Sequence, residues 1–169
     1  MQLEDFFDYK NQLMKDVLTN KEIVRLLNDD IALEDAANLA YEQVMPFEYI
    51  GETLFDGRTF IMFDVDIQAQ IAGSNKTFYS PTIYVWVMAH RSRMRLPDGG
   101  GVRTDKLCSE ICKTINGSRL YGLGQLNLYS VRRFAPVTDY TGKMMTFHAK
   151  EFNRQYDPTQ YVPSNRKSG

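Results

Sequence analysis

Cysteine and histidine are scarce in this 169-residue sequence, which holds two of each. Cys108 and Cys112 lie four residues apart, so they share one face of a predicted helix and are typical of small core residues in a reducing compartment. A zinc site completed by His90 and His148 is the alternative. The cysteines of such sites are usually closer in sequence, and both histidines lie in predicted strands. We therefore predict no metal and no cofactor.

The sequence also lacks an excess of charge of one sign, and it has no long apolar run. The 20 Lys and Arg against 21 Asp and Glu give a net charge of −1, so total charge does not favour nucleic-acid binding. No apolar run approaches the roughly 20 residues of a membrane span. The first five residues are acidic, whereas a signal peptide begins with basic residues. We therefore expect that the protein is made in the cytoplasm and does not associate with a membrane.

Catalytic motifs are missing as well. Gly99, Gly100 and Gly101 precede a predicted helix, but the Gly-Lys-Ser/Thr ending of a P-loop does not follow them. Asp64 and Asp66 alternate on a predicted strand, about 7 Å apart, and could hold a divalent cation. No third acid or histidine nearby completes a hard-metal set, and two scattered histidines allow no triad. We predict that the protein is not an enzyme; a hydrolase or nuclease built on the two aspartates is the weaker interpretation.

Helical periodicity dominates the first 45 residues. Apolar spacing predicts an amphipathic helix over residues 3–18. Thr19 and Glu22 match a capping box, so we expect Thr19 to cap a second, short helix. Residues 31–44 are rich in alanine and predict a third helical piece, which Pro46 ends.

Period-two alternation marks a long hairpin over residues 57–91. In its second strand, apolar residues alternate with aromatic or amphipathic ones. We therefore expect both faces of this strand to be covered, by its own domain or by a neighbouring subunit. Gly73 to Lys76 supplies the turn. A helix over residues 105–115, capped by Thr104 and ended by Asn116-Gly117, comes next. A second hairpin is predicted over 125–134 and 143–152, with its turn at 139–142.

These elements predict an α+β fold with a mainly antiparallel sheet of two hairpins, in the order α-α-β-β-α-β-β, and with the helices packed on one face. We expect a single domain over residues 1–152, with an N-terminal helical segment at 1–45. Residues 153–169 form an extended, basic tail that a partner would have to order.

Basic residues cluster in two places. Arg91, Arg93 and Arg95 would point to one side of a strand and form a stripe, and Arg132-Arg133 ends a later strand. A small nucleic-acid-binding module using the stripe is one interpretation. Ion pairing with a neighbouring element or subunit is the other, and the balanced total charge favours it.

The order of the elements resembles a known family. Phe-Ile-Met-Phe-Asp-Val-Asp-Ile at 60–67, Ile-Tyr-Val-Trp-Val at 83–87 and the helix opening after Arg-Thr-Asp at 103–105 carry the likeness. In this arrangement the chain, from the first strand to Phe152, is similar to the tail terminator and head–tail joining proteins of long-tailed bacteriophages and phage-derived tail-like particles.

The resemblance implies a structural virion protein, made in the host cytoplasm, that closes a ring of six copies on the tail tube and binds the head connector. Genomic DNA would pass through the central channel without sequence-specific contacts. Another neck component, such as a head-completion or connector protein, is the alternative. The expected roles are subunit contacts for Tyr84 and Trp86, which would be exposed on a single chain, and for Arg91, Arg93, Arg132 and Arg133. Asp64 and Asp66 would line the channel, and partner docking is expected for Gly99, Gly100, Gly101, Arg166 and Lys167.

Overall fold

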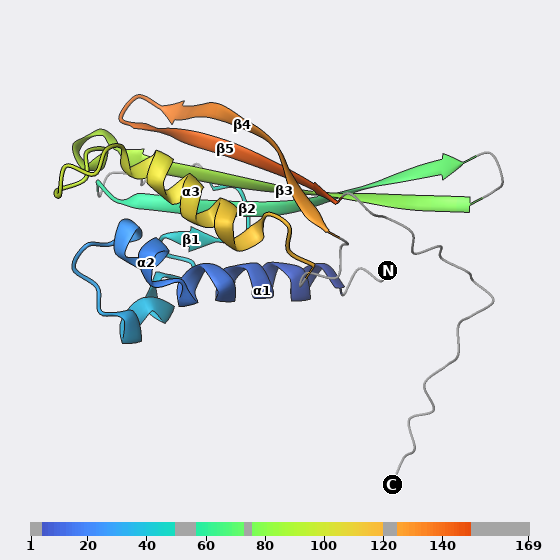
Figure 1. Cartoon of the computed structure of the whole chain (residues 1–169), viewed down its shortest axis with the longest axis horizontal. Coiled ribbons are helices and arrows are strands. Elements are labelled where there is room, and N and C mark those ends of the chain that lie inside the picture. The colour runs from blue at the N-terminus through green and yellow to red at the C-terminus, as the bar shows by residue number, and fades with distance from the viewer. Residues whose placement is uncertain (1–4, 50–56, 73–75, 120–124, 150–169) are drawn as a thin grey trace, which may run out of the picture.

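The computed structural model describes residues 5–49, 57–72, 76–119 and 125–149 (Figure 1). The predicted tail over 153–169 lies outside the described residues. Within the described residues, no helix is both long and apolar enough to cross a membrane. The elements are the helices α1 (Asp5–Thr19), α2 (Lys21–Leu27) and α3 (Arg103–Ile115), the 3-10 helices η1 (Leu33–Leu39) and η2 (Arg91–Arg93), and the strands β1 (Val44–Met45), β2 (Thr59–Ala72), β3 (Lys76–His90), β4 (Leu126–Val137) and β5 (Tyr140–Ala149).

The strands form one sheet in the order β1-β2-β3-β5-β4. The long hairpin β2–β3 is paired along its whole length, from Thr59 opposite Ala89 to Ala72 opposite Lys76. The second hairpin joins it through β5, which runs antiparallel to β3. Only the two-residue β1 is parallel to its neighbour. The α+β fold, the two hairpins and their mainly antiparallel pairing are confirmed.

The helices cover one face of this sheet, as predicted. Their buried apolar stripes meet the alternate residues of β2 and β3 that share a face, including Phe63 and Val85. The helical layer and this sheet face thus form the main core, whose members include Leu13, Val17, Ile23, Leu27, Ile61, Ile83, Val87, Leu107 and Ile111.

The opposite sheet face carries a second, smaller core. Phe60, Met62, Trp86, Met88 and Tyr140 are buried there together with Met45. The prediction that β3 is covered on both sides is confirmed. The expectation that Trp86 is exposed is wrong, because only 8% of its surface is accessible to solvent.

The start of α2 differs from the prediction. The Asn20 side chain, not Thr19, caps the helix, accepting hydrogen bonds from the backbone N–H of Glu22 (3.1 Å) and Ile23 (3.3 Å). Thr19 is still the last residue of α1, where its hydroxyl donates to the Lys15 carbonyl at 2.8 Å. The helix α1 runs one residue further than predicted, which moves the cap by one position.

Three further boundaries differ. The predicted helix over 31–44 is only the 3-10 helix η1. The helix α3 starts at Arg103, so Thr104 is buried in its first turn and caps nothing. The turn of the second hairpin is Thr138-Asp139, and residues 140–142 already belong to β5. The end of α3 at Asn116-Gly117 is confirmed, with Gly117 at φ +80°.

Gly142 permits the close packing of β5 on β3. It lies opposite Met88, and a Cβ atom there would collide with the backbone carbonyl of Val87. The position therefore requires glycine for space rather than for an unusual φ.

Candidate functional site

Arg103 is the most constrained charged residue of the described structure, with 2% of its surface exposed. Its guanidinium donates to both carboxylate oxygens of Asp29, at 3.1 and 2.7 Å, and to the Leu26 carbonyl at 2.7 Å. Its Nε donates to the Arg93 carbonyl at 2.8 Å. One side chain thus ties α3 to the end of α2 and to η2. Sequence reasoning missed it, although a cation in the first turn of a helix, where the macrodipole favours acids, was a usable signal.

The predicted arginine stripe does not form. The residues after His90 leave the strand and enter the 3-10 helix η2, which turns successive side chains in different directions. Arg93 lies 3.9 Å from the Asp29 carboxylate, whereas Arg95 sits in an isolated bridge with Val102. The prediction that Arg91, Arg93 and Arg95 line one side of a strand is therefore wrong. Without this stripe, the geometry on which we based a nucleic-acid-binding module is absent.

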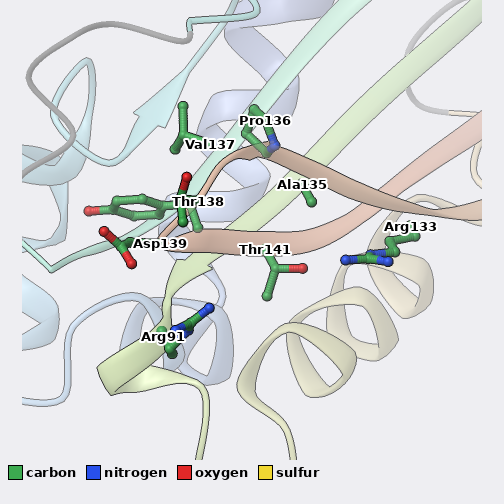
Figure 2. Close-up of a pocket in the computed structure, with 9 residues that line it drawn as sticks. Arg91, Arg133, Ala135, Pro136, Val137, Thr138, Asp139 and Thr141 are labelled. Carbon is green, nitrogen blue, oxygen red and sulfur yellow. The ribbon is translucent and has the colours of Figure 1, made fainter.

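The structure instead brings together Arg91 and Arg133, which belong to the two separate basic clusters of the sequence. Both line a hollow of about 480 Å³ beside the β4–β5 turn, called here the basic hollow. Figure 2 shows their guanidinium groups entering it from two sides, with Thr141 between them. The Arg91 N–H donates to the Asp139 carbonyl at 2.8 Å, which fixes η2 against the turn.

Arg132 and Arg133 are both exposed but lie on opposite faces of β4. Arg133 pairs in register with Lys143, whose ammonium lies 3.7 Å from the Asp105 carboxylate on α3. Arg133 is therefore on the helical side, whereas Arg132 is on the other. Their predicted role in subunit contacts stays a prediction.

Tyr84 and Trp86 stack on each other, with ring centroids 5.8 Å apart. Trp86 is buried and Tyr84 is half-buried, so Tyr84 offers the larger accessible surface of the pair. Their role in subunit contacts also stays a prediction.

Asp64 and Asp66 lie on the face of β2 opposite the helices, as the alternation predicts. Asp64 is held by Lys10 of α1, at 2.5 Å, and it accepts from the N–H of Val65 at 2.8 Å. Asp66 is exposed. In the described parts of the chain, no three His, Cys, Asp or Glu side chains gather as a metal site. The channel-lining role of the aspartates stays a prediction.

The glycine loop is a closed turn. Leu96 donates from its N–H to the Gly101 carbonyl at 3.1 Å. Gly99 at φ +74° and Gly101 at φ +101° take conformations that favour glycine. Docking on Gly99, Gly100 and Gly101 stays a prediction, and Arg166 and Lys167 lie outside the described residues.

Cys108 and Cys112 lie on one side of α3, and both are free thiols. Cys108 is buried in the main core, and Cys112 is half-buried. Burial, and secondarily the charge of Asp105, raises the pKa of the Cys108 thiol from 9.0 to about 12. Cys108 is therefore a core residue that stays protonated at neutral pH, as its spacing predicted, and not a nucleophile.

Exposed apolar side chains gather on β4, which is an outer strand of the sheet. Leu128, Tyr129 and Val131 are 37%, 68% and 47% exposed. The Tyr129 ring stacks on His148 of β5, with centroids 4.4 Å apart. Sequence reasoning treated these residues as ordinary strand residues and missed their exposure.

Comparisons with known proteins give two findings. Residues 20–149 match the model of the YomW family. A protein chain in the virion of a native gene transfer agent particle has a similar structure, at a TM-score of 0.42 and 13% identity, over 75% of this chain and 89% of the other. No curated protein matches the chain.

Proposed function

We propose that this chain, which belongs to the YomW family, is a structural protein of a phage-derived virion that assembles with copies of itself and with other virion proteins. The family is associated with phages, which supports a place in such a particle. In the finer form of the proposal, the chain closes a six-membered ring at the end of the tail tube and joins it to the head connector.

The projecting end of the β2–β3 hairpin carries this proposal. β5 pairs with β3 only over Thr82–His90, and β1 pairs with β2 only at Ile61 and Met62. Beyond these contacts, residues 67–72 pair with 76–81 as a ribbon of two strands, which extends past the rest of the sheet in Figure 1. Six residues of strand span about 20 Å.

A two-stranded ribbon is only marginally stable in water unless something packs on it. A ribbon of this kind gains stability when other subunits cover it. The geometry therefore favours an assembly role, in which the domain anchors the ribbon and neighbouring proteins hold its end.

The proposal assigns no reaction to the chain. The basic hollow and the open edge of β4 are surfaces suited to protein contacts, and Asp66 presents an exposed carboxylate on the face away from the helices. If this face lines the DNA channel, the carboxylate repels phosphates and lets the genome slide.

Particles purified from the phage that encodes the chain test the proposal. We expect the chain in the particles by mass spectrometry, at one end of the tail by electron microscopy. Absence from purified particles contradicts it.

A variant with the ribbon shortened, residues 69–79 replaced by Asn-Gly so that the paired Gln68 and Ser80 flank the new turn, should keep the fold but lose incorporation into particles. The control replaces Lys15 by Ala, an exposed residue of α1 outside every predicted contact, and should leave incorporation intact. Normal incorporation of the shortened variant contradicts the role of the ribbon.

A further inference from the structure

We propose that the basic hollow receives an acidic corner of a second copy of this chain. The acidic corner consists of Asp30, Glu34 and Asp35, around the start of η1. The inference rests on the proposed function, because it specifies one contact through which copies of the chain assemble.

The basic hollow contains two arginine side chains that are available for ion pairs. Arg91 and Arg133 are exposed, and within the described residues neither has an ion-pair partner. Asp139 is the one acidic residue among its lining residues, so the hollow has a net positive charge. Guanidinium groups bind carboxylates with two parallel hydrogen bonds, and Ala135 and Pro136 provide an apolar rim.

The acidic corner is the complement. Asp30, Glu34 and Asp35 are exposed, and none of them has an ion-pair partner in the parts of the chain that are described. Leu33, 42% exposed, lies among them and could pack on the apolar rim. The neighbouring Asp29 does not belong to this surface, because Arg103 holds it.

The two surfaces lie at opposite edges of the sheet. The basic hollow is beside β4, the last strand at one edge, and η1 leads directly into β1 at the other edge. Figure 1 shows η1 below the helices and the β4–β5 turn above them. A contact between two different patches is heterologous, so it repeats from copy to copy and closes into a ring when the rotation allows.

A protein carboxylate fits the hollow better than a DNA backbone does. DNA binding requires a row of cations that follows successive phosphates. Here Arg93 lies beside Asp29, neither Arg93 nor Arg95 lines the hollow, and Asp139 adds a repelling charge at the hollow itself. Two converging guanidinium groups match one or two carboxylates.

Charge reversal tests the contact. Arg133→Glu and Glu34→Arg should each weaken self-association in low salt by about tenfold or more, since an attraction between exposed charges becomes a repulsion. The double variant Arg133→Glu/Glu34→Arg restores complementary charges and should recover most of the lost association. Arg95→Glu is the matched control, with the same charge change at an exposed arginine that does not line the basic hollow.

Sedimentation equilibrium of the full chain, with circular dichroism to verify folding, measures these effects. Association that survives both single reversals, or that falls as much with Arg95→Glu, overturns the inference. A wild-type chain that stays monomeric at all concentrations overturns it too, while the presence of the chain in particles still decides the proposed function. Loss in both single variants with recovery in the double variant supports the contact.

Discussion

Removing Arg103 should destabilise the fold more than removing any exposed arginine. Arg103→Ala deletes four hydrogen bonds and leaves the carbonyls of Leu26 and Arg93 without these donors. Each lost bond to a buried carbonyl costs about 1 kcal/mol. The Asp29 carboxylate is one-third exposed, so water compensates part of its loss. Together with the cavity, we expect a loss of about 3–4 kcal/mol in the free energy of unfolding.

Asp29→Ala should cost nearly as much, about 3 kcal/mol, because the Arg103 guanidinium keeps its two carbonyl partners but is left buried without a counter-ion. Urea denaturation with circular dichroism measures both variants, and the double variant gives the coupling energy of the pair. Arg95→Ala, at an exposed arginine, is the control and should stay within about 0.5 kcal/mol of wild type. If Arg103→Ala costs no more than Arg95→Ala, or if Asp29→Ala costs more than Arg103→Ala, the reasoning is refuted.

Three other changes test particular contacts. Asn20→Ala should cost about 1 kcal/mol in urea denaturation and Thr19→Ala markedly less, because the Asn20 side chain caps α2; equal costs would contradict this. Gly142→Ala should lower the stability by at least about 2 kcal/mol, since its methyl group collides with the β3 backbone; an unchanged melting temperature would be the contrary result. At pH 8 a thiol reagent should modify Cys112 and spare Cys108 until urea unfolds the chain. Because the Cys108 pKa is raised from 9.0 to about 12, the folded state holds its proton more tightly, and stability should fall above pH 9 by up to about 1.4 kcal/mol per pH unit, a slope that Cys108→Ala should reduce.

The sequence predicted the two hairpins of the sheet but not the short parallel strand β1, which was read as the end of a helix. Period-two alternation in β2 and β3 reflects burial that differs between the two faces of one strand, and such local patterns survive in the fold. The confirmed α+β class, the helices on one face and the buried Cys108 all follow from periodicity. Boundaries were less certain because neighbouring residues competed for the same role, as Thr19 and Asn20 did at the start of α2.

The contacts between residues far apart in the chain could not be predicted from the sequence. Arg103 meets Asp29 across 74 positions, and no local pattern links them. Arg91 and Arg133 share the basic hollow only because β5 lies between β3 and β4 and the chain turns into η2 after His90. The sequence analysis extended the strand through Arg95 and so predicted a stripe of arginines. This stripe does not form, because the chain enters the 3-10 helix η2 at Arg91. Trp86 looked exposed because nothing local showed that a second core covers its face.

The continuity of β2 and β3 has a mechanical consequence. Each strand runs without interruption from the buried core to the end of the ribbon. A pull on that end, directed along the strands, loads many inter-strand hydrogen bonds at once in shear, whereas a sideways pull would peel them apart one after another. Once neighbouring proteins hold the end of the ribbon, the hairpin therefore carries axial tension along both strands into the main core.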